Sequence, residues 1–145
     1  MPIKGMDNVK KAIAKTKTQA NMDIKGVYFS GLRTIIKATP VDEGRARNNW
    51  FLTDGMPSGL SGRNASISGG GSDASLMTMP PDVLNKKIYF TNNLPYIGVL
   101  EFGGYPTPGT DKTTGGYSTQ LTPFRSPKGW VRATLISMAN KVRSL

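Results

Sequence analysis

Residues 39–50 read TPVDEGRARNNW, and this stretch decides where the first helix ends and how the rest of the chain begins. Pro40 lacks an amide proton and disfavours the α conformation at Thr39, so a preceding helix cannot continue through it. A helix stop is therefore expected at Thr39.

A capped turn is expected immediately after this stop. The carboxylate of Asp42 can accept the amide protons of Gly44 or Arg45, and Glu43 then lies in the positive first turn. The stretch therefore predicts a helix stop, a capped turn and the start of a strand, in that order.

A long amphipathic helix is predicted from Met6 to about Ala38. Apolar residues recur there at spacings of three and four, as one face of an α-helix requires. Gly26 and Gly31 each weaken this helix by about 1 kcal/mol relative to alanine, and they mark either close packing or a bend. The apolar positions are Val9, Ile13, Ala20, Ile24, Val27, Tyr28, Leu32, Ile35 and Ile36.

Two short strands are predicted to pair as an antiparallel sheet. The first, NNWFLTD at residues 48–54, places its tryptophan and leucine on one face and its phenylalanine on the other. The second, KKIYFTN at residues 86–92, places Ile88 and Phe90 on one face. We interpret Trp50 as an anchor of the core.

Long loops are predicted at residues 55–82 and 103–127, which are rich in glycine, serine, threonine and proline. The SGGGS run at residues 68–72 lacks the following Lys-Ser/Thr of a phosphate-binding loop, so we interpret it as flexible. We expect both loops to become ordered on neighbouring subunits. Deletion of residues 59–75 is expected to leave a folded protomer that no longer assembles.

A short buried helix is predicted within NNLPYIGVLEFGG, residues 92–104. Asn93 can cap it, Pro95 is tolerated in its first turn, and Gly103 or Gly104 can end it. Its faces are nearly all apolar, so it must be buried in the fold or against another subunit.

A terminal helix is predicted within PKGWVRATLISMANKVRSL, residues 127–145. It is expected to pack beside the first helix on one face of the sheet, which gives a single α+β domain over residues 1–145. Its apolar stripe is Val131, Leu135, Met138 and Val142.

Composition limits the chemistry that this chain can perform. It has no histidine and no cysteine, so the usual general base near neutral pH, the commonest zinc ligand and the strongest nucleophile are missing. No secretory signal and no membrane-length apolar window are seen, so we expect a soluble, non-secreted protein. No cofactor is expected.

The net charge of +10 favours polyanions or acidic protein surfaces as partners, or serves solubility alone. The excess is concentrated in the first 37 residues. Possible DNA-facing residues are Lys10, Lys11, Lys17, Lys25 and Arg33. Aromatic residues lie among the basic ones, but no fingerprint of a nucleic-acid-binding module is present, so binding would be non-specific.

The carboxylates could in principle hold magnesium for a hydrolase, but no spacing supports such a site. Each has an ordinary role available, such as a bond between Glu101 and Arg45 or Arg47. For these two arginines we favour a structural role over phosphate binding. The acidic residues considered are Asp42, Glu43, Asp54, Asp82, Glu101 and Asp111.

Three segments together, TPVDEGRARNNW, TNNLPYIGVLEFGG and SPKGWVRAT, follow a basic amphipathic helix in this order. Their combination resembles the tail-completion or neck proteins of long-tailed bacteriophages, over almost the whole chain apart from the two loops. Glu43 departs from the family pattern, which more often has threonine there. The matching residues are Pro40, Val41, Asp42, Gly44, Arg45, Arg47, Asn49, Trp50, Leu94, Pro95, Tyr96, Leu100, Glu101 and Gly103.

The resemblance implies a non-enzymatic virion protein that is assembled in the host cytoplasm, and it assigns structural roles to the matching residues. It implies a ring of identical subunits, a hexamer by analogy, at the top of the tail around the DNA channel. The implied partners are the tail terminator, tail-tube and connector or adaptor proteins. A tail terminator ring, a DNA-binding or packaging accessory protein and a carboxylate-metal hydrolase remain alternatives.

Overall fold

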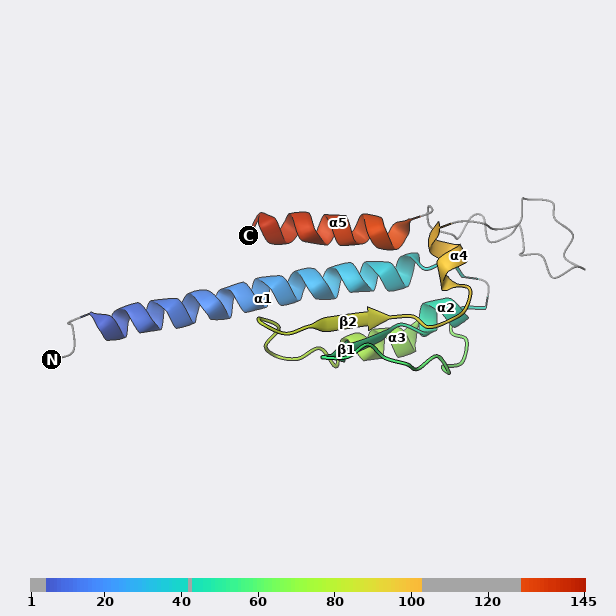
Figure 1. Cartoon of the computed structure of the whole chain (residues 1–145), viewed down its shortest axis with the longest axis horizontal. Coiled ribbons are helices and arrows are strands. Elements are labelled where there is room, and N and C mark those ends of the chain that lie inside the picture. Colours follow the sequence, from blue (N-terminus) through green and yellow to red (C-terminus); the bar gives the residue numbers. More distant parts are fainter. Residues whose placement is uncertain (1–4, 42, 103–128) are drawn as a thin grey trace, which may run out of the picture.

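The computed structural model describes residues 5–41, 43–102 and 129–145. Helices precede, separate and follow the two strands of one small antiparallel sheet (Figure 1). The predicted mixed α+β class is therefore confirmed. In order, the described elements are α1 (Met6–Ala38), α2 (Arg45–Asn48), β1 (Phe51–Asp54), α3 (Gly70–Leu76), β2 (Ile88–Thr91), α4 (Ile97–Phe102) and α5 (Trp130–Arg143).

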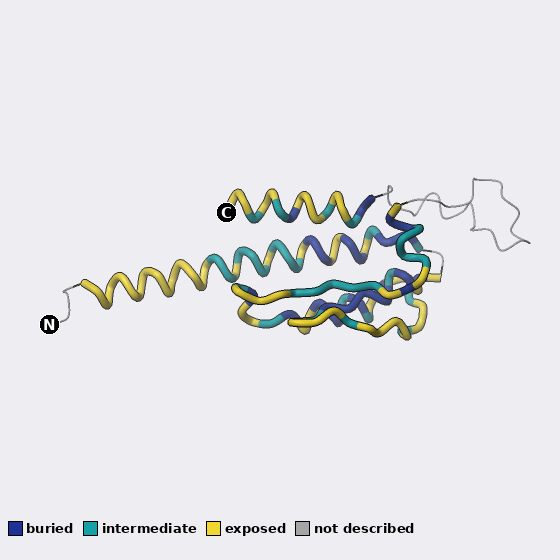
Figure 2. The backbone as a smooth tube through the Cα atoms, viewed as in Figure 1, coloured by how far each residue is buried: buried dark blue, intermediate teal, exposed yellow. Residues whose placement is uncertain are grey.

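Helix α1 has the predicted bounds and ends where Pro40 requires. Thr39 leaves the helical conformation with φ −58° and ψ 126°. The N-terminal half of α1 projects beyond the body of the protein, and residues 5–19 are all exposed (Figures 1 and 2). The C-terminal half is buried at Gly31, Leu32, Ile35 and Ile36.

Helix α5 packs along α1, as predicted, and α1 lies between α5 and the sheet in Figure 1. A Cβ atom at Gly31 would overlap the side chain of Met138, so this glycine marks close packing, whereas a Cβ at Gly26 would meet open space. Leu135 of the predicted stripe is less buried than expected, at 48% exposed. Together with Met138 of the same stripe it lines a groove described below.

Strands β1 and β2 pair antiparallel, as predicted. The register places Leu52 opposite Phe90, and the rings of Trp50 and Phe90 stack with centroids 5.0 Å apart. Phe51 points to the other face, where the guanidinium of Arg63 lies 3.9 Å from its ring centroid. The predicted faces of both strands are therefore confirmed.

The first strand begins later than its sequence predicts. Asn48 belongs to α2 and Asn49 is the residue after that helix, so RARN forms one helical turn rather than a simple turn. Both asparagine side chains are buried and bond to neighbouring backbone groups, which removes these residues from the sheet. Pairing starts at Phe51.

The prediction of a loop without helices at residues 55–82 is wrong. SGGGS leads into helix α3, which packs against α1 and β1. Ser72 and Ser75 are buried, and their hydroxyls accept the amide protons of Trp50 and Leu52 at 2.9 and 2.8 Å. The segment is thus ordered on its own protomer, and we expect its deletion to unfold the protein. The predicted loop 103–127 lies outside the described residues.

Helix α4 exists where predicted but begins at Ile97. Asn93 does not cap it, because its side-chain amide donates to the carbonyls of Ser58 and Leu60 at 2.6 and 3.0 Å. Leu100 is buried, but Phe102 is 60% exposed, so burial of the helix is incomplete.

The core collects the apolar faces of these elements into one cluster. Its centre lies around the C-terminal half of α1 and the face of the sheet that carries Trp50. The buried members are Leu32, Ile35, Ile36, Ala46, Trp50, Leu52, Leu76, Met79, Val83, Leu94, Leu100, Trp130 and Met138.

Candidate functional site

The three sequence segments that carry the family resemblance meet at the C-terminal end of α1. Thr39 is fully buried there, and its hydroxyl donates to the carbonyl of Ile35 at 2.7 Å. The same hydroxyl accepts the indole proton of Trp50 at 2.9 Å. The indole of Trp130 donates to the carbonyl of Ile35 at 3.2 Å. Two tryptophans from distant segments thus bond to the last turn of α1, Trp130 at the carbonyl of Ile35 and Trp50 at the hydroxyl of Thr39, the residue that ends the helix.

Arg47 closes the end of α1 from the side of α2. Its guanidinium donates to the carbonyls of Lys37 and Thr39 at 2.7 and 3.1 Å and to that of Ile67 at 2.8 Å. A cation at this position is favoured by the negative end of the helix dipole. Burial lowers the pKa of Arg47 from its usual value. All three of these bonds are to backbone carbonyls, so Arg47 has the structural role that the sequence favoured over phosphate binding.

Asn48 and Asn49 bind α2 to the segment that precedes α3. Asn48 donates to the carbonyl of Asn64 at 2.8 Å and accepts the amide proton of Gly71 at 2.6 Å. Asn49 accepts the amide proton of Arg63 and donates to its carbonyl, both at 3.0 Å, as a paired strand residue would. Asn49 is fully buried, so these bonds replace those with water.

Gly44 allows the close approach that these bonds require. Its φ of 87° lies in the left-handed region, and a Cβ atom there would overlap the backbone of Ser66 and Ile67. The carbonyl of Gly44 accepts the amide protons of Asn48 and Ser66 at 3.1 and 3.2 Å. Both the conformation and the space therefore require glycine.

Glu101 caps helix α5 and does not contact Arg45 or Arg47 as the sequence suggested. Its two carboxylate oxygens accept the amide protons of Val131 and Arg132 at 3.0 and 3.1 Å. Its carbonyl accepts the amide proton of Gly129 at 2.7 Å. A carboxylate suits the unpaired amides and the positive dipole end of a helix N-terminus. The side chain is 10% exposed, so α4 and α5 are joined inside the protein.

The remaining predicted motif residues lie around this cluster. Arg45 is exposed on the outer side of α2, and Asp42 and Gly103 lie outside the described residues. Pro40, Leu94 and Leu100 are buried, Val41 and Tyr96 are half-buried, and Pro95 is exposed.

Sequence reasoning missed the partners that the Gly/Ser-rich segment supplies. Arg63 donates to the carbonyls of Asn48 and Trp50 at 3.1 and 2.7 Å, and burial lowers its pKa. Ser72 donates to the carbonyl of Arg47 at 2.7 Å, in addition to accepting from β1. Serines three residues apart, followed by LMTM, give one signal that could have indicated a short helix with a buried face.

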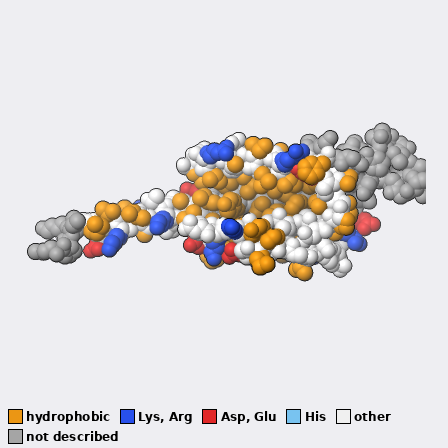
Figure 3. Space-filling view, in the orientation of Figure 1, with side chains coloured by type: hydrophobic (Ala, Val, Ile, Leu, Met, Phe, Trp, Pro, Cys, Tyr) orange, Lys and Arg blue, Asp and Glu red, His pale blue; other side chains and the backbone are white. Residues whose placement is uncertain are grey.

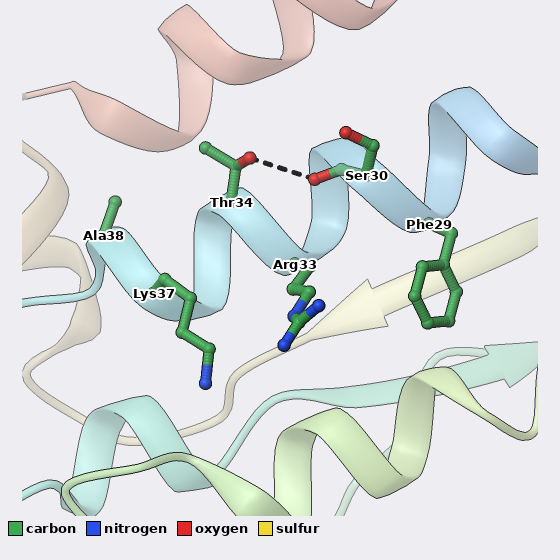
Figure 4. A pocket seen from close by; sticks show the side chains of 6 residues that line it. All are labelled: Phe29, Ser30, Arg33, Thr34, Lys37 and Ala38. Carbon is green, nitrogen blue, oxygen red and sulfur yellow. Dashed lines mark hydrogen bonds between the residues drawn. The ribbon is translucent and has the colours of Figure 1, made fainter.

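The five basic residues considered for DNA do not converge on one site. Lys10, Lys11 and Lys17 are exposed around the projecting part of α1, and Lys25 is half-buried farther along. Arg33 lines a surface groove of about 650 Å³ on α1, where it points the same way as Lys37 (Figure 4). Lys37 there bonds to the carbonyl of Ser68 at 2.8 Å and to Asp73 at 3.0 Å.

Within residues 5–41, 43–102 and 129–145, no cluster of three or more acidic side chains could hold a metal ion. In the same ranges no helix has the length and apolar character needed to cross a membrane. Comparison with known protein families, curated proteins and solved structures finds no match for this chain. The fold and the cluster at the end of α1 therefore carry the functional argument.

Proposed function

We propose that this chain is a structural protein of the neck of a long-tailed bacteriophage, a tail-completion protein that forms a ring joining the tail to the head connector. It is a component of the virion and performs no catalysis. Its partners are copies of itself, six by family analogy, together with the tail terminator, tail-tube and connector proteins. A tail terminator ring is the closest alternative of the same class.

One observation carries the proposal: the segments that resemble the family have interlocking roles. Residues 39–50 end α1 and bond to its last turn through Thr39 and Arg47. Residues 91–104 supply Glu101, which caps the helix that begins within the third segment. The third segment returns Trp130 to the same turn of α1. A shared structural purpose for all three segments supports their origin in one family of scaffolding subunits.

A non-specific DNA-binding protein is the second candidate, favoured by the exposed lysines on the projecting half of α1. Salt separates the two candidates. Binding that neutralises several phosphates weakens steeply as salt increases, whereas assembly through apolar contacts persists. We expect DNA retention at 50 mM salt to be lost by 200 mM, with self-assembly intact.

The proposal is tested in a phage that encodes this chain by placing a stop codon early in its gene. Electron micrographs of the lysate should then show filled heads and separate tails, and the chain supplied in trans should restore joined particles. Normal numbers of joined particles without the chain would refute the proposal. A Glu101→Gln variant supplied in trans should also restore joined particles, because it weakens one buried cap and leaves the surface unchanged.

A further inference from the structure

The projecting half of α1 carries an apolar stripe that has no partner among the described residues. Met6, Val9 and Ile13 are spaced by three and four, so they share one face of the helix. They are 40%, 53% and 52% exposed. The same face continues to Gly31, where Met138 of α5 packs. The stripe is therefore an extension of the surface that α1 already uses for helix packing.

An apolar groove lies open on the body of the protein. Its floor is α1, one wall is α5 and the other is β2, and hydrophobic side chains fill this face in Figure 3. The groove holds about 500 Å³, which lies within the range of concave binding sites in proteins. Its apolar lining is Tyr28, Leu32, Ile88, Phe90, Leu135 and Met138.

The stripe and the groove cannot meet within one copy of the chain. Both belong to the same continuous helix, and Ile13 precedes Tyr28 by about 22 Å along the helix axis. This half of the helix extends away from the body of the protein (Figure 1), and the groove lies on that body. A contact between them therefore requires two copies, and it joins different surfaces on the two partners.

We propose that residues 6–20 of one copy dock into the α1–α5–β2 groove of the next copy, with Met6, Val9 and Ile13 facing Leu135 and Phe90. The docked helix extends the existing core, because Leu32 and Met138 belong to both the core and the groove. Contacts of this kind between unlike surfaces close into rings when the rotation allows. The inference rests on the proposed function in that a ring needs such a contact, and it names the surfaces that form it.

Charge gives the contact a distinctive salt dependence. Lys87 lies at the groove beside Lys86, which pairs with Asp54 at 3.4 Å. The docking segment is itself basic, with Lys10, Lys11, Lys15 and Lys17. Salt screens repulsion between like charges, so self-association should strengthen as salt rises, opposite to binding of DNA.

The experiment uses two variants of the full chain, Ile13→Glu for the stripe and Leu135→Glu for the groove. Both side chains are about half exposed, so each variant should fold, which circular dichroism verifies. Analytical ultracentrifugation should show that the unmodified chain associates and that each variant alone is a monomer. An equimolar mixture of the two should form a 1:1 dimer and nothing larger, because one intact stripe and one intact groove remain. Met22→Glu, at an exposed apolar residue on the opposite side of α1, should associate like the unmodified chain.

Every other result overturns the inference. An unmodified chain that stays monomeric, or a mixture of variants that stays monomeric, rules out the contact. Association of Leu135→Glu alone would show that stripes pair with each other or that other surfaces are used. These outcomes leave the neck role intact, because that role is tested separately, by counting joined particles in electron micrographs. The association assay uses the purified chain alone.

Discussion

Replacing Gly44 by alanine should be far more costly than the same change at Gly55, although both glycines have left-handed backbones with φ of 87° and 86°. A non-glycine residue in this conformation costs about 1–2 kcal/mol at either site. At Gly55 nothing lies within 4 Å of an added Cβ, so the conformational cost is the whole effect.

At Gly44 the added Cβ overlaps backbone atoms of Ser66 and Ile67, which cannot rotate away as a side chain could. The two segments must separate, and this breaks the bond from Ser66 to Gly44 and the bond from Arg47 to Ile67. Each lost bond costs about 1 kcal/mol. Gly44→Ala should therefore destabilise by about 3–4 kcal/mol, against about 1–2 kcal/mol for Gly55→Ala.

Urea unfolding, followed by tryptophan fluorescence, measures both free energies. The midpoint of Gly44→Ala should fall well below that of Gly55→Ala, with similar slopes for the two variants. Equal midpoints would mean that α2 and the segment before α3 do not pack as described, and would refute the structural explanation of the glycine in TPVDEGRARNNW.

Three further predictions concern α1 and its partners. Gly26→Ala should stabilise the protein by about 1 kcal/mol through helix propensity. Gly31→Ala should be less stable than Gly26→Ala by about 1–3 kcal/mol, because its Cβ displaces a buried methionine. Thermal unfolding that ranks the two variants in reverse order would contradict the α1–α5 contact. Glu101→Gln should cost about 1–2 kcal/mol in urea unfolding, since a neutral amide offers one acceptor where the carboxylate offers two; an unchanged midpoint would show that the cap is unimportant. Thr39→Val should lower the free energy of unfolding by about 1–3 kcal/mol, because it leaves a buried indole proton unpaired. The same change at the exposed Thr18 should be near neutral. Similar losses of stability at both sites would argue against the indole bond.

Local signals were enough to predict much of this fold. The bounds of α1 follow from a repeated spacing of three and four and from Pro40, whose effect on the preceding residue does not depend on the rest of the chain. The faces of β1 and β2 follow from strict alternation around Trp50 and Phe90. These features are determined within short segments, so they can be predicted without knowledge of long-range contacts.

The sequence could not predict the bonds that hold distant segments together. Asn48, Asn49, Ser72 and Ser75 are typical of loops, and their burial depends on backbone groups up to 25 residues away. Glu101 was assigned to an arginine because opposite charge was its only visible cue, whereas the amides of α5 lie 30 and 31 residues later. Every residue offers similar backbone amides and carbonyls, so residue types alone do not show which backbone groups a side chain will bind.

The central claim, that the chain is a neck component of a phage particle, is tested most directly by counting its copies in purified particles with quantitative mass spectrometry. We expect a small, fixed number of copies per joined particle, equal to one ring or a whole multiple of it. Purified infectious particles that contain none of this chain would contradict the claim.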